Sequence, residues 1–308
     1  MVRAMASTSG RPGPLARAAV LDRREVLFRE TALETCERVA LGAAWTLQPK
    51  RIARLWPLAR LWVADLTGSD RGLPQPEDAR DDSGLCGIAR DLSPPTLIAA
   101  YRRGLFPGGH TAPVKWLSPP ARCVLFFDEF HIAKRLRRVM RQGRYAVTFD
   151  REFERVIKAC ASRREGRWHV TWITPRIMRA YADLHDAGHV HSFEVWNEAG
   201  ALVGGGYGVA FGRIFCTESQ FSHEPNTSKV GFSVLNWHLA RWGYVLNDGK
   251  NATPTIVEMG FRMIPRIQLQ LHLALDGGDA GGRPGRWEVE AGANVVAGWQ
   301  PEQIHVAE

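Results

Sequence analysis

The chain has 308 residues, 45% of them hydrophobic, and carries a formal net charge of +8. That length can bury a sizeable core in one large domain or two modest ones, and no apolar run approaches the roughly 18 to 20 residues of a membrane-spanning helix. Five scattered cysteines with no C-x-x-C pair argue against a disulfide framework or a structural zinc site and favour a reducing compartment. We therefore expect a cytoplasmic protein without a membrane span.

Residues 1–84 differ from the rest of the chain and are expected to form an N-terminal extension. They contain one expected helix over 24–44, the basic aromatic segment "PKRIARLWPLARLW" and the acidic linker "LPQPEDARDDSG". The basic segment is typical of helices that lie on a membrane surface or on nucleic acid. Packing of its Trp and Leu residues against the body is the commoner arrangement, and both interpretations stay open.

From Cys123 onward, expected strands and helices alternate. "CVLFF" predicts a strand, 131–142 a basic amphipathic helix, and "YAVTF" a second strand. Apolar residues then recur at helical spacing over 153–160. Asp150 precedes this helix and is expected to cap it.

Thr174 and Pro175 predict the start of a further helix, because they suit its cap and first-turn positions. A meander of strands comes next, "VHSFEVW", "ALVGGGYGVAFG" and "RIFCTES", followed by a helix over 228–242 and the short strand "YVLND". The Gly-rich tail over 275–308 is expected to be largely flexible. The alternation predicts an α/β (α+β) body built on a mixed sheet.

Three histidines in "HDAGHVH", His185, His189 and His191, are close enough in sequence to share a zinc ion. Gly188 breaks the helix that would align the first two, and the further ligands of a zinc site are not recognisable around them. A structural role is favoured, so no metal site is predicted. The run "GGGYGVAFG" lies between strands without the Lys and Ser or Thr of a P-loop, which favours bulges or close backbone contacts over a phosphate site.

Two carboxylates stand at the ends of expected strands. Glu218 follows "RIFCT", and Asp248 closes "YVLND". Ligands of α/β proteins gather near strand ends, so both residues could face one crevice. Each could instead cap the turn that follows it. Ser222 beside His223 carries little weight as a nucleophile and base, because neighbours on a strand point to opposite faces.

Positive charge gathers between His131 and Trp168, where twelve Lys and Arg residues stand against four Asp and Glu residues. The cluster "AKRLRRVMRQGR" could attract phosphates, since a patch of one sign raises association with polyanions. A solvated helix face explains the same residues equally well.

Several motifs follow one another over roughly residues 84–272: "DLSPPTLIAAYRRGLFP", "WLSPPARCVLF", "HIAKRLRR", "TWIT", "AYADLHDAGHVHSFEVW", "GYGVAFGRIFCTESQFS" and "MGFRMIPR". In these motifs the chain resembles the leucyl/phenylalanyl-tRNA–protein transferases of bacteria. The resemblance implies an aminoacyltransferase that takes an apolar amino acid (Leu, Phe or Met type) from its tRNA and joins it to the N-terminal amine of a protein, a modification of the N-degron type. It also implies that the enzyme uses no metal and no nucleotide cofactor.

The same resemblance implies an architecture and a set of partners. A small domain is expected over 85–120 and a catalytic domain with the acetyltransferase-like (GNAT) fold over 121–274. The partners would be aminoacyl-tRNA and a protein or peptide N-terminus, and the protein is expected to be a monomer.

Site residues are implied position by position. Glu218 and Asp248 match functional positions of the family, with Lys250 beside them, and the aromatic residues Trp172 and Tyr181 match substrate-binding positions. The wall of the aminoacyl site would include Gln220, Phe221 and Ser222. The basic helix would contact tRNA through Lys134, Arg135, Arg137, Arg138 and Arg141.

The chain departs from the family pattern at several places, which include Trp116-Leu117 in place of the family's "WW" and a longer N-terminal extension. Lys250 stands in "LNDGK" where the family has the glutamine of "LIDCQ", and Gly108 replaces an aromatic residue. A lysine beside a carboxylate stays charged, which makes Lys250 a poor base but a suitable partner of an oxyanion or phosphate. We expect this added charge to shift the acceptor preference towards neutral or acidic N-termini.

Two other functions fit the same residues. An acyl-CoA-dependent N-acyltransferase would keep the fold, although the usual R/Q-x-x-G-x-G/A turn that binds pyrophosphate is not evident. A catalytically inactive tRNA-binding paralogue would follow if Gly108 and Lys250 mark a decayed site.

Overall fold

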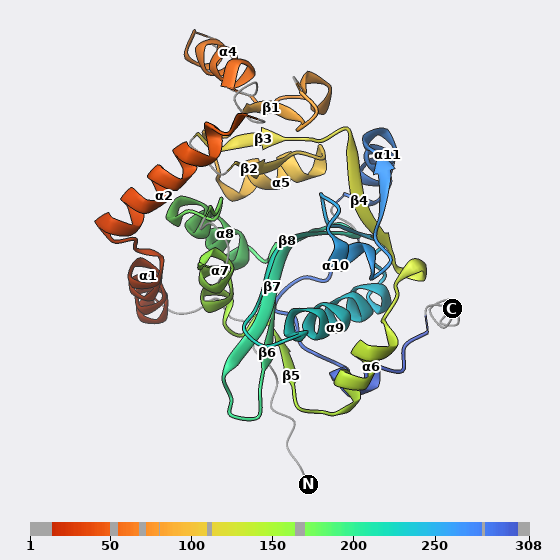
Figure 1. The fold of residues 1–308 in the computed structure, drawn as a ribbon. Helices are drawn as coiled ribbons and strands as arrows, with labels where there is room; N and C mark the ends of the chain where they lie inside the picture. The colour runs from red at the N-terminus through yellow and green to blue at the C-terminus, as the bar shows by residue number, and fades with distance from the viewer. Residues whose placement is uncertain are drawn as a thin grey trace.

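The computed structural model describes residues 14–49, 55–67, 72–79, 81–109, 113–163, 170–278 and 281–300. The described strands form a three-stranded sheet in the order β1-β3-β2 and a seven-stranded sheet in the order β10-β4-β9-β8-β7-β6-β5 (Figure 1). Helices pack on both faces of the larger sheet. The mixed α+β class predicted from the sequence is confirmed.

The seven-stranded sheet is antiparallel except for one pair of strands. Its strands are β4 (Ala121–Phe126), β5 (Ala146–Phe149), β6 (Val190–Trp196), β7 (Leu202–Phe211), β8 (Ile214–Ser222), β9 (Leu246–Asp248) and β10 (Arg262–Pro265). The parallel pair is β8 and β9, which α9 (Thr227–Arg241) connects, and its register sets Cys216 opposite Asp248. Asp248 at the end of β9 is thereby brought beside the middle of β8, where Glu218 lies, and not at the strand end expected from the sequence.

Helices cover the larger sheet in two layers. α7 (Phe153–Ala161) and α8 (Pro175–Asp186) pack on one face, and α9 and α6 (Lys134–Arg141) belong to the core on the other. The predicted start of α8 is confirmed, because the Thr174 side chain accepts a hydrogen bond from the backbone N–H of Ile177. Short helical turns at η2 (Phe127–Glu129) and α10 (Pro254–Val257) complete this part.

The glycines of β7 allow close packing. A Cβ at Gly208 would lie 2.4 Å from both the Phe215 ring and the carbonyl oxygen of Cys216. The β7–β8 register also shifts between Tyr207 and Gly208. Bulge and close contact are what the sequence indicated for this run.

The smaller sheet lies next to the larger one, above it in the view of Figure 1. It consists of β1 (Leu85–Ile88), β2 (Phe106–Gly108) and β3 (Lys115–Leu117), preceded by the turn η1 (Pro76–Asp78), and α5 (Pro94–Arg102) connects β1 to β2. α5 lies between this sheet and the body, so its residue Tyr101 reaches the larger sheet (Figure 1).

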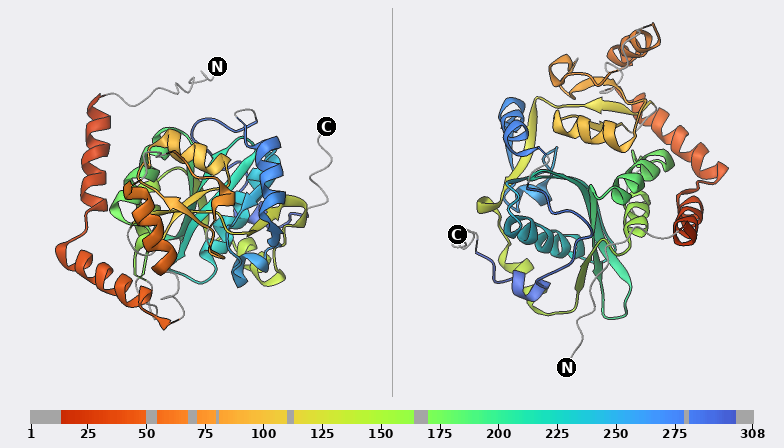
Figure 2. Two further views of the ribbon diagram at one scale, coloured as in Figure 1. Left: turned by 90° about the horizontal axis from the view of Figure 1, so that it is seen from above. Right: turned by 180° about the vertical axis from the view of Figure 1, so that it is seen from behind.

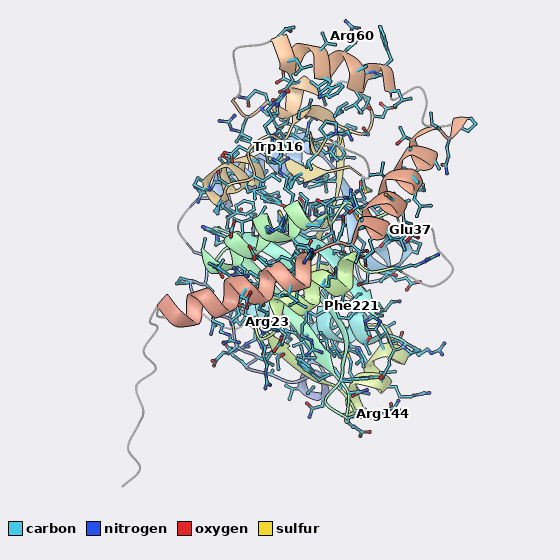
Figure 3. The ribbon with its side chains drawn as sticks, turned by 90° about the vertical axis from the view of Figure 1, so that its left-hand side faces the viewer. Arg23, Glu37, Arg60, Trp116, Arg144 and Phe221 are labelled. Atoms are coloured by element: carbon cyan, nitrogen blue, oxygen red, sulfur yellow. The ribbon has the colours of Figure 1, made fainter. Side chains whose placement is uncertain are left out.

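The N-terminal extension contains α1 (Pro14–Phe28), α2 (Ala32–Thr46) and α4 (Leu55–Thr67). The prediction of a single helix over 24–44 is therefore wrong. A new helix begins after Thr31, which caps it in a capping box with Glu34. Arg24 holds α1 to the body through ion pairs with Glu154 and Asp186. Figures 2 and 3 show the three helices along the outside of the molecule, with Arg60 of α4 at its outer end. No helix in the described ranges is both long and apolar enough to span a bilayer.

Asp150 does not cap α7, whose N-cap residue is Glu152. Asp150 takes a left-handed backbone with φ of 52°. Its buried carboxylate accepts hydrogen bonds from the backbone N–H groups of Ser192 and Trp287, each at 2.8 Å, and lies 2.7 Å from His191 Nδ1. These distant partners satisfy the carboxylate and draw it away from the helix.

The C-terminal segment is packed rather than loose over 281–300. It follows α11 (Arg266–Asp276), includes α12 (Ala293–Val296) and buries Trp287 completely. The Trp287 ring stacks on His191 with 3.6 Å between ring centroids, and Trp299 stacks on Phe130. Two tryptophans supply enough apolar area to hold a Gly-rich segment on the core, which differs from the expected flexible tail.

Candidate active site

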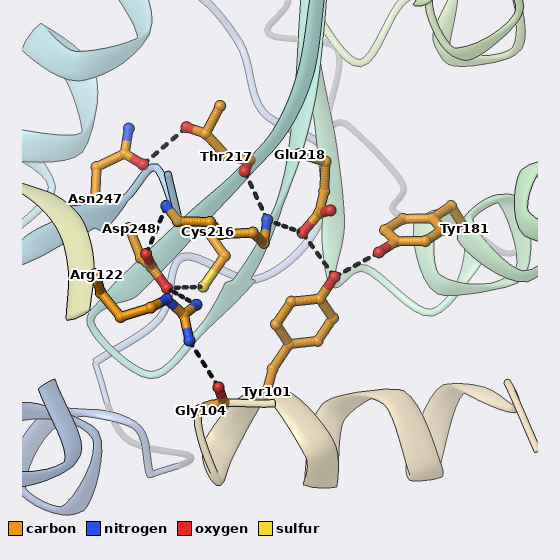
Figure 4. A network of polar contacts seen from close by, with 10 residues as sticks. Tyr101, Gly104, Arg122, Tyr181, Cys216, Thr217, Glu218, Asn247 and Asp248 are labelled. Carbon is orange, nitrogen blue, oxygen red and sulfur yellow. Dashed lines mark hydrogen bonds and ion pairs between the residues drawn. The ribbon is translucent and has the colours of Figure 1, made fainter. Parts of the chain in front are cut away.

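A polar network lies where β8 and β9 run side by side (Figure 4). Glu218 stands on β8, Asp248 ends β9, and Lys250 follows two residues later. Lys250 Nζ lies 2.6 Å from Glu218 Oε1, and the Lys250 backbone N–H donates to Asp248 Oδ1 at 2.8 Å. Both carboxylates therefore contact one residue, Lys250, and lie close together. Asp248 also caps the turn that follows it, because it accepts the hydrogen bond from the Lys250 backbone N–H.

Asp248 is enclosed by protein groups. Its Oδ2 forms an ion pair with Arg122 of β4, and the two side chains are only 2% and 1% exposed. Arg122 also donates to the carbonyl oxygen of Gly104 at 2.7 Å and lies over the Phe106 ring. A carboxylate held by so many donors is fixed in position.

Glu218 connects the same site to two tyrosines. The Tyr101 hydroxyl donates to Glu218 Oε1 at 2.6 Å and lies 2.5 Å from the Tyr181 hydroxyl. Burial raises the pKa of both phenols well above its usual value, and the negative charge of Glu218 adds to the effect. Both hydroxyls therefore stay protonated near neutral pH and can donate hydrogen bonds.

Lys250 has an unusual backbone. Its φ is 64°, a left-handed backbone conformation that residues other than glycine rarely adopt. The Nζ atom also donates to the carbonyl oxygen of Thr217 at 2.7 Å and lies 5.4 Å from the centre of the Phe106 ring. Such conformations cluster at functional sites.

Comparison with known proteins shows the family to which the chain belongs. The sequence models described as leucyl/phenylalanyl-tRNA protein transferase and as its N-terminal domain match residues 124–274 and 90–120. A leucyl/phenylalanyl-tRNA–protein transferase of Azotobacter vinelandii is 46% identical over 205 residues, which are 66% of this chain and 87% of that protein. Those of Pseudomonas syringae pv. syringae (47%, with 63% and 84% covered) and of Anaeromyxobacter sp. (43%, with 71% and 92% covered) are also similar. The chain belongs to this family.

In this member of the leucyl/phenylalanyl-tRNA–protein transferase family, the site residues predicted from the sequence form two groups. One group lies in or beside the polar network, and the other lies at the end of β8. Glu218, Asp248, Lys250 and Tyr181 lie together, and Trp172 meets Tyr181 edge to face with 6.1 Å between ring centroids. Phe221 is buried, and Gln220 is half-buried. Ser222 is exposed and binds the start of α9, because its hydroxyl accepts from the Ser228 N–H at 3.0 Å.

Sequence reasoning missed two members of the network, Tyr101 and Arg122. Tyr101 comes from α5, far away in the chain, and nothing local links it to β8. Arg122 left a signal, because it directly precedes the apolar run "CVLFF", and an arginine that such a strand buries needs a partner for its charge. Cys216 also lies near, with Sγ 3.8 Å from Asp248 Oδ2. Burial raises its pKa well above the usual value, and Asp248 adds to this, so it remains a thiol.

The basic helix α6 lies beside α12 on the far side of α9 from α5 (Figure 1). Four of its predicted tRNA-binding residues are exposed: Lys134, Arg135, Arg138 and Arg141. Arg137 is half-buried and donates to the carbonyl oxygens of Ile132 and Ala297. Burial lowers its pKa, with a further contribution from Arg141. Arg137 thus holds the C-terminal segment in place.

The histidines of the segment 185–191 have structural contacts. His185 Nδ1 lies 2.8 Å from the Val190 carbonyl oxygen and its ring stacks on Phe153, whereas His191 is paired with Asp150. Among the residues that the structure describes, no three His, Cys, Asp or Glu side chains are grouped as a metal site would need.

Proposed function

We propose that this chain is an aminoacyltransferase that moves an apolar amino acid, of the Leu, Phe or Met type, from aminoacyl-tRNA to the N-terminal amine of a protein. Membership of the transferase family supports this, and the observation that carries it to this chain is the buried network of Glu218, Lys250 and Asp248. The product would be a protein with one added N-terminal residue, a modification of the N-degron type.

The reaction needs no further activation. The donor carbonyl is already an ester, so the acceptor nitrogen attacks it, a C–N bond forms, and the C–O bond to the tRNA breaks. The α-amino group has a pKa of roughly 8, so it must lose a proton first. That proton leaves through the carboxylates and ends on the tRNA hydroxyl, and the amide remains on the protein.

We infer a role for each group of the network. Asp248, held by Arg122, orients the incoming amine and steers its proton. Lys250 and the Tyr101 hydroxyl bind the other carboxylate, Glu218, and the Lys250 ammonium supplies positive charge for the oxyanion of the transition state. Trp172 contributes an aromatic wall for the apolar donor side chain.

We also infer the domain boundaries and the fold of the catalytic domain from membership of the family. We infer a small domain over 85–120 and an acetyltransferase-like (GNAT) catalytic domain over 121–274, supported by the parallel β8–β9 pair within an otherwise antiparallel sheet. Residues 1–84 form an extension, and 275–308 follow the catalytic domain. The enzyme would act as a cytoplasmic monomer.

Mass spectrometry of a peptide library with varied N-termini tests the function. The purified protein is incubated with the library and total aminoacylated tRNA. Added mass on a subset of peptides, equal to one apolar residue, is the expected result and identifies donor and acceptor together. Intact tRNA binding without added mass on any peptide would contradict the proposal and favour a binding paralogue.

Replacing Lys250 by glutamine is expected to change which acceptors react. The ammonium of Lys250 neutralises Glu218 at 2.6 Å, so a cationic first residue of the acceptor gains little attraction there. Without it, peptides that begin with Arg or Lys should gain in kcat/KM over neutral ones by roughly tenfold, the effect of about 1.4 kcal/mol. Competition between two labelled peptides measures the ratio. An unchanged ranking in the Lys250→Gln variant would show that this lysine does not set acceptor preference.

The exposed residues of α6 are proposed as a tRNA surface. Replacing Lys134, Arg135, Arg138 and Arg141 together by alanine is expected to reduce the slope of log Kd against log salt by about 3, since each phosphate contact contributes about 0.7 to 0.9. Filter binding at several salt concentrations measures the slope. The control replaces Lys229 and Arg262, which Glu258 and Glu129 already neutralise. Equal slopes in both variants would place the tRNA elsewhere.

A further inference from the structure

A cavity of about 450 Å³ lies between the N-terminal extension and the body of the protein. The extension contributes Trp45 from α2 and Leu55 and Leu58 from α4. The body contributes Phe106, Leu117 and Asn251. The family match begins at residue 90, so one wall of this cavity comes from a part of the chain outside that match.

The cavity adjoins the active site. The Phe106 ring that lines it lies 5.4 Å from Lys250 Nζ and 4.8 Å from Arg122 Cζ. Asn251, on the same wall, is the residue after Lys250. A molecule in the cavity would therefore rest against the ring that supports the two cations of the site.

The charges of the cavity indicate which substrate it takes. Asp81 and Asp82 line it together with Lys115, whose pKa burial lowers to about 8. The two carboxylates outnumber the one ammonium, so the net charge of these three groups is negative. It becomes more negative as the pH rises through about 8, because Lys115 then loses its proton. Phosphates of a tRNA end would be repelled, whereas a peptide with a cationic group would be attracted. The apolar wall of Trp45, Leu55 and Leu58 suits a hydrophobic side chain.

We propose that the N-terminal extension is part of the substrate site and that this cavity binds the first residues of the acceptor polypeptide. An apolar side chain of the acceptor packs on Trp45, and a cationic one lies near Asp82. The proposal rests on the proposed transferase function, because it assigns the cavity to that reaction's acceptor. Trp45 and Asp82 then determine acceptor specificity.

The test compares Trp45→Ala with Trp56→Ala. Both tryptophans belong to the extension, but Trp56 is 69% exposed and lines no part of the cavity. The Kd of a fluorescent hexapeptide that carries leucine and lysine after its N-terminal residue is measured by anisotropy, which needs no turnover. We expect Trp45→Ala to weaken binding about tenfold, an effect of about 1.4 kcal/mol, and Trp56→Ala to leave it unchanged.

A second variant guards against a folding artefact. Asp82 is exposed, so Asp82→Asn should leave the fold intact, and it should weaken binding only of lysine-containing peptides. Two-substrate kinetics then separate acceptor from donor: KM for the peptide should rise in Trp45→Ala while KM for aminoacyl-tRNA stays the same. A rise in KM for aminoacyl-tRNA alone, or unchanged peptide binding in both variants, would overturn the proposal. Native protein that binds the peptide without transferring an amino acid would instead contradict the transferase function.

Discussion

Asp248→Asn is expected to slow aminoacyl transfer by about 10²- to 10⁴-fold, the contribution of a positioned acid–base group. The amide keeps the size of the carboxylate and can still accept the hydrogen bond from the Lys250 N–H, which is 2.8 Å long in the native protein. It loses the negative charge that, in the proposed reaction, holds the ammonium of the acceptor and receives its proton. Single-turnover transfer of a labelled amino acid to a peptide measures the rate directly.

The control for this variant is Asp276→Asn. Asp276 is also a buried aspartate paired with an arginine, Arg213, but it belongs to α11, outside the network of the site. Its replacement should leave the transfer rate close to that of the native protein, and tRNA affinity should be the same in both variants. An Asp248→Asn enzyme as fast as the control would mean that the carboxylate acts only in the structure.

Arg122→Leu is expected to lower the free energy of unfolding by about 3–5 kcal/mol, because it leaves the carboxylate of Asp248 buried without its ionic partner. The variant also loses the hydrogen bond to the Gly104 carbonyl oxygen and the contact with the Phe106 ring. Urea unfolding, compared at equal m-value, gives the difference. Arg262→Leu is the matched control: its partner Glu129 is 38% exposed, so the loss should stay below about 1 kcal/mol.

A double variant separates stability from catalysis. When Asp248 is replaced by leucine in the Arg122→Leu background, neither charge of this buried pair remains, and most of the lost stability should return. Transfer activity should not return, since the carboxylate is gone. A double variant as unstable as the single one would show that the arginine stabilises the fold through its other contacts.

Local patterns predicted those elements whose cause lies within a few residues. The expected strands "VHSFEVW" and "RIFCTES" appear as β6 and part of β8, and Thr174 with Pro175 starts α8 as expected. The helix boundary at Thr31 also has a local cause, the capping box of Thr31 and Glu34, but the prediction of one helix over 24–44 did not take it into account. Motif order over 84–272 identified the family, which the matches to 90–120 and 124–274 confirm.

The sequence by itself thus determined the class of fold, the family and the two strands that carry Glu218 and Asp248. The expected position of Glu218 at a strand end was wrong, because β8 continues to Ser222. Only the tertiary structure decided that Lys250 pairs with Glu218 and that Tyr101 and Arg122 complete the network, because these partners lie 32, 117 and 126 positions away in the chain. The same holds for Asp150, which looked like a helix cap until His191 and Trp287 supplied stronger partners. A buried charge must be satisfied wherever the fold brings a partner to it, and no local pattern records where that is.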